Sequence, residues 1–220
     1  QGDNLFTKLA EVKRRLEPMG RNAVKSHGQL RLDNEMSRAL SGVLRFDGGH
    51  LMDTGGFISL PRIMQHCTKV LKNAQVPSLF AFAIQTNNKR RFEVKMQHCE
   101  VADTEVPWVR ACQGQSKQIK KKLDPSLAND QPIERALDMP DLAVHGTTMK
   151  SWCAIKETDG MVAGRRGDIH FATALPTNDL GRNSQVSGLK NEDVWIFLDL
   201  EKAWKNKLPM TLSTNGVLLV

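Results

Sequence analysis

Arginine residues at the edges of expected helices and strands are the side chains of this sequence best suited to binding phosphate. Arg45 ends an expected helix, Arg91 opens an expected strand, and Arg166 precedes another, while Arg110 lies within a strand. A guanidinium group donates two parallel charge-assisted hydrogen bonds, which match the oxygens of a phosphate. Each arginine taken singly is more often a surface residue in a weak ion pair, and the spacing does not show that the four converge.

The motif His145-Gly146-Thr147 at a strand end is a second candidate site. A glycine lets a ligand approach the backbone, and the histidine and threonine side chains supply directional hydrogen bonds. Loops that follow strands often carry binding residues. An ordinary turn with a histidine satisfied inside the protein explains the same three residues.

His170 and Asp168 alternate with the apolar Ile169 and Phe171, so they point to one face of an expected strand. An Asp–His pair in this position either fixes a histidine tautomer, holds a ribose hydroxyl, or forms a plain structural hydrogen bond. The sequence leaves these alternatives open.

The bulk composition favours a basic protein that partners a polyanion. The 220 residues suit one large domain or two small lobes, and Lys plus Arg exceed Asp plus Glu by 31 − 24 = 7. RNA, DNA and nucleotide phosphates are candidate partners, although a basic protein without such a partner fits equally well. The absence of tyrosine and the 5% aromatic content do not favour a stacking platform.

Membrane, secretory and metal-dependent classes are not indicated. No apolar run approaches the roughly 18 residues of a membrane span, and the polar first residues carry no secretory signal, so we expect a cytoplasmic or nuclear protein. The cysteines form no C-x-x-C pair, which predicts reduced thiols and no metal site. We expect a monomer. The four cysteines are Cys67, Cys99, Cys112 and Cys153.

The first half of the chain predicts short helices followed by a basic hairpin, an order typical of a winged-helix lobe. Residues 34–114 form this expected RNA- and phosphate-binding lobe, after an N-terminal extension at 1–33. Helices are expected at 4–16, 34–46, 61–73 and 76–84, and strands at 55–59, 87–96 and 105–112.

The second half predicts a lobe that is mainly β. Residues 115–140 are charged and carry Asp-Pro and Asn-Asp turn signals, which predict a linker. The following lobe, 141–220, contains one expected helix at 149–160. Its strands are expected at 142–147, 168–173, 194–200 and 216–220.

Six motifs in the same order resemble the tRNA 2′-phosphotransferase (KptA) family. Each motif is weak alone, but their ordered recurrence over residues 36–220 is specific. The segment at 36–65 resembles the family's Leu-Ser-x-x-Leu-Arg-His opening, and NNKRRFEV (87–94) its Asn-Asp-Lys-x-Arg-Phe segment. The later segments are VRACQGQS (109–116), VHGTT (144–148), GMVAGRRGDIHFA (160–172) and STNGVLLV (213–220).

The resemblance implies an α+β fold with an N-terminal winged-helix lobe and a C-terminal ADP-ribosyltransferase-like β-rich lobe. It implies NAD as co-substrate in the second lobe, no metal, and 2′-phosphorylated RNA, especially tRNA, in the cleft between the lobes. In the implied reaction, the RNA 2′-phosphate attacks the nicotinamide ribose and expels nicotinamide. The neighbouring ribose hydroxyl then attacks that phosphate, releasing repaired RNA and ADP-ribose cyclic phosphate.

The same resemblance implies a role for each matched residue. The catalytic arginines correspond to Arg45, Arg91 and Arg166. The NAD contacts correspond to His145, Gly146, Thr147, His170 and Arg166. The phosphate and RNA contacts correspond to Arg45, Lys89, Arg91, Arg110, Gln113 and Ser116.

Departures from the family pattern leave three hypotheses. Histidines of the family are replaced by Phe46, Gln115 and Asp168, its aspartate by Asn88 and its tryptophan by Leu218. Phenylalanine neither donates a hydrogen bond nor carries a proton, so the second step should suffer most. The chain is then a working 2′-phosphotransferase, an ADP-ribosyltransferase that stops after the first step, or a silent paralogue that binds RNA or NAD. The retained arginines argue against silence, and we favour the first hypothesis.

Overall fold

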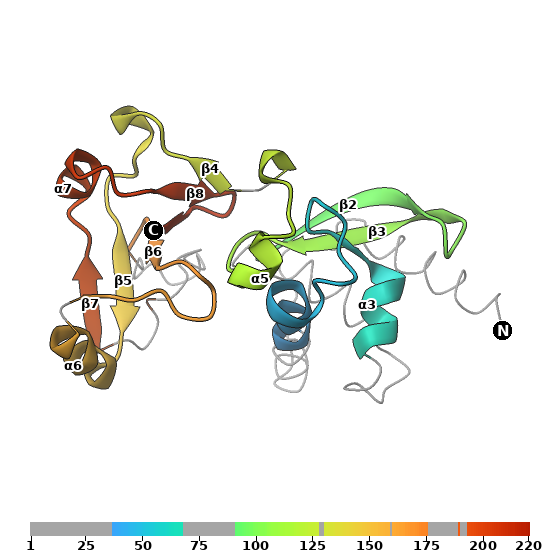
Figure 1. The fold of residues 1–220 in the computed structure, drawn as a ribbon, viewed down its shortest axis with the longest axis horizontal. Helices are drawn as coiled ribbons and strands as arrows, with labels where there is room; N and C mark the ends of the chain where they lie inside the picture. Colours follow the sequence, from blue (N-terminus) through green and yellow to red (C-terminus); the bar gives the residue numbers. More distant parts are fainter. Residues whose placement is uncertain (1–36, 68–90, 128–129, 159, 176–188, 190–192) are drawn as a thin grey trace, which may run out of the picture. The chain divides into compact units, whose positions relative to one another are not determined.

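A computed structural model of the chain describes residues 37–67, 91–127, 130–158, 160–175, 189 and 193–220 (Figure 1). The expected N-terminal extension, the expected helix at 76–84, and Asn88 and Lys89 lie outside these residues. The chain divides into two compact units. Unit 1 contains the described residues up to 67, together with Phe92–Ala111 and Lys121–Asp124. Unit 2 contains Arg91, Cys112–Lys120 and the described residues from Pro125 onward.

The first described helix of unit 1 changes its hydrogen-bonding pattern partway along. Residues 37–42 are α-helical, and the π-helical turn η1 (Val43–Asp47) follows. Leu40 and Leu44, four residues apart, are fully buried, so they anchor the same side of the helix in the core. The helix predicted at 34–46 is confirmed for its described part, but the apolar spacing did not predict the π turn.

A short helix and an antiparallel sheet follow in the described part of unit 1 (Figure 1). α3 (Leu60–Cys67) has Pro61 in its first turn, where a missing backbone N–H is tolerated. The sheet has the order β1-β3-β2, formed by β1 (Ile58–Ser59), β3 (Thr104–Ala111) and β2 (Phe92–Cys99). The strands predicted at 87–96 and 105–112 are confirmed for their described parts, with β2 continuing three residues past 96, whereas the strand predicted at 55–59 is limited to Ile58–Ser59. Ile58, Ile63 and Val109 join the helical leucines in one core.

The segment predicted as a linker contains ordered elements. They are α5 (Lys117–Lys120), η2 (Pro125–Leu127), β4 (Asp130–Pro132) and η3 (Ala136–Asp138). β4 pairs antiparallel with β8 (Thr211–Ser213), so this stretch includes the edge strand of the sheet of unit 2. An edge strand with polar side chains is held by backbone hydrogen bonds, and it therefore leaves little hydrophobic pattern in the sequence.

Unit 2 is built on a six-stranded antiparallel sheet of order β4-β8-β9-β6-β5-β7. The strands predicted in this half are confirmed as shorter ones: β5 (Val144–Thr147), β6 (His170–Ala172), β7 (Val194–Phe197) and β9 (Val217–Leu219). α6 (Met149–Glu157) confirms the predicted helix but ends before Gly160. α7 (Leu200–Lys205) and β8 were not predicted. Ala143, Phe171, Ala203, Met210 and Leu218 form a buried core cluster.

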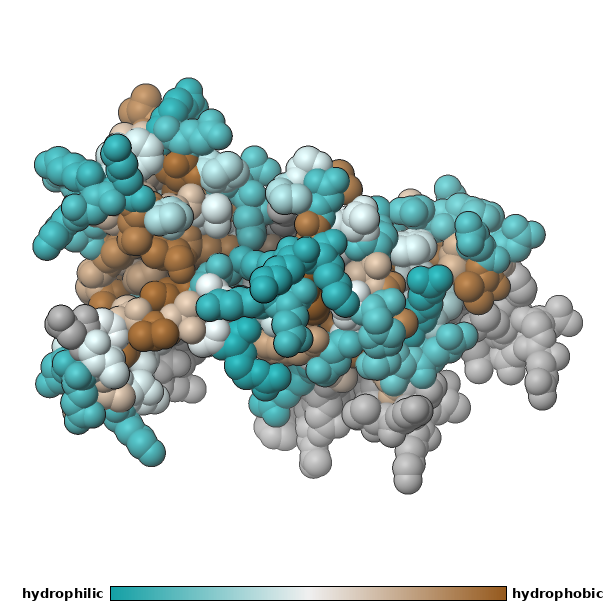
Figure 2. All heavy atoms as spheres, in the orientation of Figure 1, coloured by the Kyte–Doolittle hydropathy of each residue, from teal (hydrophilic) through white to brown (hydrophobic). Residues whose placement is uncertain are grey.

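The two units share an α+β character, as predicted, because each combines short helices with an antiparallel sheet. Figure 2 shows hydrophobic residues over the sheet of unit 2 and hydrophilic side chains over α5. The four cysteines are free thiols. Among the described helices, none has the length and apolar character needed to cross a bilayer.

Candidate functional site

Arg91 and Arg166 lie close enough in unit 2 to influence each other electrostatically. Arg91 is half-buried just before β2, and its carbonyl accepts a hydrogen bond from the Cys112 amide at 2.8 Å. Arg166 is exposed in the turn that precedes β6. Burial lowers the pKa of Arg91, and the positive charge of Arg166 lowers it further. Two guanidinium groups of like charge near each other create a local field that attracts an anion.

The loop before α5 supplies buried polar groups to the same unit. Gln113 is buried, and within the described part of the chain its Oε1 atom has no hydrogen-bond partner. Gly114 follows with φ +82°, a conformation that favours glycine. Ser116 uses its Oγ atom to accept from the Ile119 amide at 3.3 Å, so it caps α5. Of the two residues predicted here, Gln113 has an acceptor atom without a partner among the described residues, whereas Ser116 has a structural partner.

Backbone carbonyls fix the tautomers of both candidate histidines. His145 Nδ1 lies 3.0 Å from the carbonyl oxygen of His170, and His170 Nδ1 lies 3.1 Å from that of Asp168. Because a carbonyl oxygen can only accept, each Nδ1 carries a proton and donates. In the neutral rings, Nε2 is therefore the accepting nitrogen. The Asp168 main chain, rather than its carboxylate, sets the His170 tautomer.

His145 marks the place where two central strands separate. Within the described strands, β5 and β6 share the single residue pair Val144↔Ala172, whereas β5 and β7 share four pairs. The His145 ring packs edge-on against Phe171 with centroids 5.9 Å apart. Thr147, at the end of β5, is buried. The predicted motif is thus a built part of the sheet, with a histidine ring beside the point where the ladder ends.

Arg45 and Phe46 belong to the π turn of unit 1. Arg45 is only 6% exposed, an unusual degree of burial for an arginine, and it is followed by the half-buried Phe46. π turns inserted in helices occur frequently at functional sites. The local geometry therefore singles out the same arginine that the sequence motif does.

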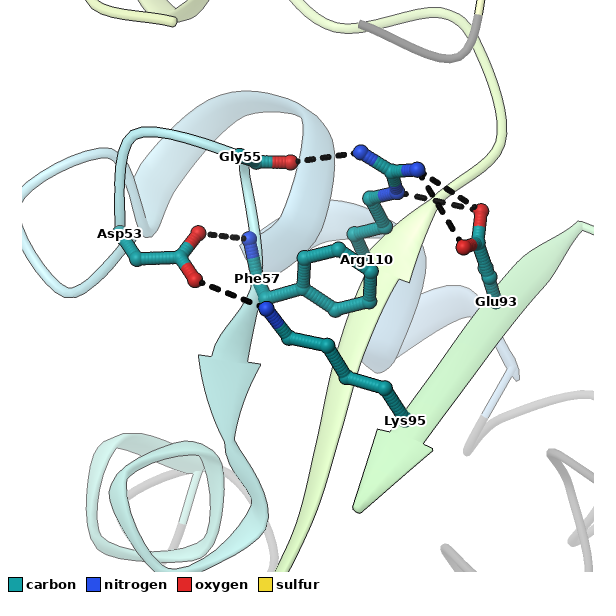
Figure 3. Close-up of polar contacts among 6 residues, drawn as sticks. All are labelled: Asp53, Gly55, Phe57, Glu93, Lys95 and Arg110. Atoms are coloured by element: carbon teal, nitrogen blue, oxygen red, sulfur yellow. Dashed lines mark hydrogen bonds and ion pairs between the residues drawn. The ribbon is translucent and has the colours of Figure 1, made fainter. Parts of the chain in front are cut away.

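The guanidinium of Arg110 serves the structure of unit 1 (Figure 3). Nε and Nη2 donate to the carboxylate of Glu93 at 3.1 and 3.2 Å, and Nη1 donates to the Gly55 carbonyl at 2.9 Å. The Arg110 guanidinium lies 4.4 Å from the centre of the Phe57 ring. These contacts hold the strands and the loop together, and the proposed contact of Arg110 with RNA stays a prediction.

The described residues contain no group of three or more His, Cys, Asp or Glu side chains that could hold a metal ion. The candidate residues of unit 2 described above, Arg91, Arg166, Gln113, Ser116, Thr147 and the two histidines, instead carry guanidinium, amide, hydroxyl and imidazole groups. Such a set suits phosphate oxygens and sugar hydroxyls.

Comparisons with known proteins agree on one relationship. The chain is 28% identical to tRNA 2′-phosphotransferase 1 of Danio rerio over 191 residues, which cover 85% of this chain and 77% of the relative. It is 30% identical to tRNA 2′-phosphotransferase 1 of Bos taurus over 213 residues, covering 92% and 74%. It is 28% identical to tRNA 2′-phosphotransferase of Saccharomyces cerevisiae over 192 residues, covering 85% and 78%.

The family model for RNA 2′-phosphotransferase, Tpt1 / KptA family, matches residues 31–220. This match spans every motif from which the resemblance was drawn, including the turns that carry Arg45, Arg91 and Arg166. The chain therefore belongs to the RNA 2′-phosphotransferase, Tpt1 / KptA family.

Proposed function

We propose that this protein is an NAD-dependent RNA 2′-phosphotransferase that removes an internal 2′-phosphate from RNA. The observation that carries the proposal is the like-charged pair Arg91 and Arg166, because its repulsion is relieved when a dianionic phosphate binds. The family match and the names of the relatives support the same activity, and they make tRNA the expected RNA. A tRNA substrate also favours the cytoplasm or nucleus as the site of action.

Unit 2 has the polar groups that a dinucleotide co-substrate needs. His145 and His170 each donate through Nδ1 to a carbonyl, so their Nε2 atoms suit ribose hydroxyl donors. Gly146 has no side chain to obstruct a ligand at the backbone. The unmatched Oε1 of buried Gln113 is a further acceptor for a hydroxyl or amide donor. The residues therefore fit NAD, and we assign its binding to this unit.

The proposed reaction makes and breaks one bond in each of two steps. In the first, an oxygen of the RNA 2′-phosphate forms a bond to the ribose carbon of NAD, and nicotinamide leaves with the electrons of its glycosidic bond. In the second, the neighbouring ribose hydroxyl attacks phosphorus, and the RNA 2′-oxygen leaves and takes up a proton. The products are RNA with a 2′-hydroxyl and ADP-ribose cyclic phosphate.

The arginines perform the electrostatic work of both steps. Arg91 and Arg166 hold the phosphate, and their charges stabilise the negative charge that builds on its oxygens in the second step. We propose a phosphate-binding role for Arg45 because it occupies the catalytic arginine position of the family motif. The burial of Arg45, which is 6% exposed, limits the orientations that its guanidinium can adopt.

The two units support the family architecture as a proposal. Unit 1 has a helix, α3 and the β2–β3 hairpin in the order of a winged helix, and we propose that it carries the RNA-binding lobe. Unit 2 has a β-rich sheet that separates beside His145, and we propose an ADP-ribosyltransferase-like lobe. Residues 115–140 then contribute to the second lobe through β4.

Phe46 defines the second candidate function. A phenylalanine supplies no proton to the leaving 2′-oxygen, so an enzyme that stops after ADP-ribosylation of the RNA phosphate is the alternative. A short RNA with one internal 2′-phosphate should be incubated with NAD and its products separated by mass. RNA with a 2′-hydroxyl is expected. Accumulation of ADP-ribosylated RNA would support the alternative, and intact substrate without free nicotinamide would reject both.

A further inference from the structure

We propose that Lys120 is a positioning residue that acts through Asp168 to hold Arg166 in place for the substrate phosphate. Lys120 Nζ lies 2.5 Å from Asp168 Oδ2, and 3.8 Å from Asp130 Oδ2. Asp168 follows Arg166 by two residues in the same turn. The inference rests on the proposed function, since the role of Lys120 is defined by the phosphate that Arg166 binds.

Partial burial makes the Lys120–Asp168 pair different from an ordinary surface ion pair. The two side chains are 31% and 19% exposed, and that of Asp130 is also 19% exposed. In contrast, Lys205 and Glu201 on α7 are 70% and 78% exposed. Water screens the exposed pair strongly, whereas charges that are partly removed from water interact more strongly and cost more when left alone.

A second residue of α5, Lys117, lies close to the turn that carries Arg166. Gly167 has φ +86°, and a Cβ atom at this position would lie 2.9 Å from Cγ of Lys117. The Gly167 amide also donates to the Gly164 carbonyl at 3.1 Å and closes the turn. Of the two residues that follow Arg166, Asp168 is thus paired with Lys120, and Gly167 lies beside Lys117. A rigid support of this kind limits the directions in which the Arg166 guanidinium can point.

The segment that leads into α5 also holds Arg91. The Cys112 amide donates to the Arg91 carbonyl at 2.8 Å, and Ser116 caps the helix that ends at Lys120. Residues 112–120 therefore connect the backbone of one arginine to the turn of the other. Lys120, at the end of this segment, brings a charged side chain to the turn that carries Arg166.

The sequence explains why this chain needs the lysine. Asp168 stands where the family motif has a histidine, and it brings a negative charge close to a phosphate site. An unneutralised carboxylate there would attract the Arg166 guanidinium and repel the substrate phosphate. Lys120 neutralises that charge. The resulting ion pair makes Asp168, which departs from the family motif, a fixed contact between the turn and α5.

The test compares Lys120→Met, Asp168→Asn and the double variant, with Lys120→Arg as the conservative change and Lys205→Met as the matched exposed control. Binding of a fluorescent RNA with an internal 2′-phosphate is measured by anisotropy without NAD, beside the same RNA with a 2′-hydroxyl. KM, kcat and the melting temperature are measured in parallel. The 2′-hydroxyl RNA reports binding that does not depend on the phosphate.

Lys120→Met should weaken phosphate-dependent binding and raise KM for RNA by about 10–100-fold, since it leaves Asp168 uncompensated. The double variant should recover about tenfold of that loss because the two residues are coupled. Lys120→Arg and Lys205→Met should remain within about threefold of wild type, the scatter expected of independent surface changes.

Two results separate the possible failures. Equal losses in the single and double variants, or losses that follow the melting temperature and affect both RNAs alike, would overturn the positioning role. Unchanged binding by Lys120→Met in an active protein would also overturn it. A wild-type protein that neither prefers the 2′-phosphate nor turns it over would reject the proposed function itself.

Discussion

Burial and, to a lesser extent, the charge of Arg166 lower the pKa of Arg91, so these two guanidinium groups lie within electrostatic reach of each other in unit 2. Like charges held together oppose folding, and such strain is kept where a ligand of opposite charge uses it. The pair joins an arginine that precedes β2 to an arginine that precedes β6, positions that are 75 residues apart by numbering (166 − 91). Sequence spacing alone does not reveal such a contact.

Replacing either arginine by alanine should lower kcat/KM by about 10²–10³-fold, the usual effect of removing one preorganised donor to a charged transition state. Arg166→Lys should not restore the rate, because an ammonium group lacks the planar fork. Steady-state kinetics with 2′-phosphorylated RNA provide the measurement. Full activity of Arg166→Ala would show that the motif assignment is wrong.

Arg166→Ala should lower activity without lowering the stability of the fold. Removing Arg166 relieves the repulsion on Arg91, so the melting temperature of Arg166→Ala should equal or exceed that of wild type. Differential scanning fluorimetry in low salt measures this shift. A large decrease would indicate that Arg166 supports the fold and that its loss of activity has a structural origin.

Phe46→His should speed the second step. A histidine at this position can pass a proton, which phenylalanine cannot. The ratio of ADP-ribosylated intermediate to 2′-hydroxyl RNA, followed by rapid quenching, should fall in the variant. Phe46→Leu is the control for packing, and a histidine variant with the same ratio as wild type would place Phe46 away from the reacting groups.

His145→Asn should distinguish the roles of the two nitrogen atoms of the histidine ring. Asparagine keeps a donor near the Nδ1 position for the His170 carbonyl, but it has nothing at the place of Nε2. We expect near-normal stability and about tenfold weaker NAD binding, the cost of one hydrogen bond to a ligand. Calorimetric titration with NAD tests this, and unchanged affinity would remove His145 from the NAD contacts.

Arg110→Ala should cost stability, because it removes the contacts to Glu93, Gly55 and Phe57. The expected loss is about 1–3 kcal/mol, since the arginine side chain is largely buried but Glu93 is partly exposed. Urea unfolding gives the value. Glu93→Gln keeps a neutral hydrogen-bonding group and should lose less.

Arg110→Ala also tests the expected RNA contact. The predominantly structural role predicts RNA affinity within about threefold of wild type under conditions where the variant is folded. A selective loss of RNA binding without loss of stability would instead support the sequence-based assignment.

Thiol labelling checks the described packing. Cys153 is exposed, whereas Cys67, Cys99 and Cys112 are buried, and burial raises the pKa of Cys67. Because the thiolate is the reactive form, a raised pKa slows the reaction at neutral pH. The thiol of Cys153 should therefore react much faster with an iodoacetamide reagent than the other three. This fast reaction should be missing in Cys153→Ser. Fast labelling of Cys67 in the folded protein would contradict the structure of the unit 1 core.

The sequence predicted the elements that carry strong periodicity. The spacing of Leu40 and Leu44 predicted a buried helix face, and apolar runs in the sequence predicted β5, β6 and β9. β4 and β8 were not predicted, because short strands at or near the edge of a sheet show little alternation of apolar and polar residues. α7 was not predicted, because the apolar stretch at 194–200 is typical of one strand although it includes Asp199, the N-cap of this helix. That aspartate, whose side chain accepts from the Lys202 amide, was the available signal.

The candidate site was predicted residue by residue from motifs, but its internal contacts were not. The motif assigned Asp168 as a damaging change, and nothing in the spacing linked it to Lys120, 48 residues away (168 − 120). The π turn at Arg45 also has no marker in the pattern of apolar residues. Ion pairs between residues far apart in the sequence and local backbone irregularities depend on the assembled fold, so the order of motifs does not predict them.

The proposed transfer to NAD is tested most directly by following the phosphate itself. An RNA whose internal 2′-phosphate is radiolabelled should be incubated with the protein, with and without NAD. The label should leave the RNA only when NAD is present, and it should appear in ADP-ribose cyclic phosphate together with an equal amount of nicotinamide. Label that stays on the RNA while no nicotinamide is released, or that leaves as free phosphate without NAD, would contradict the proposed transfer.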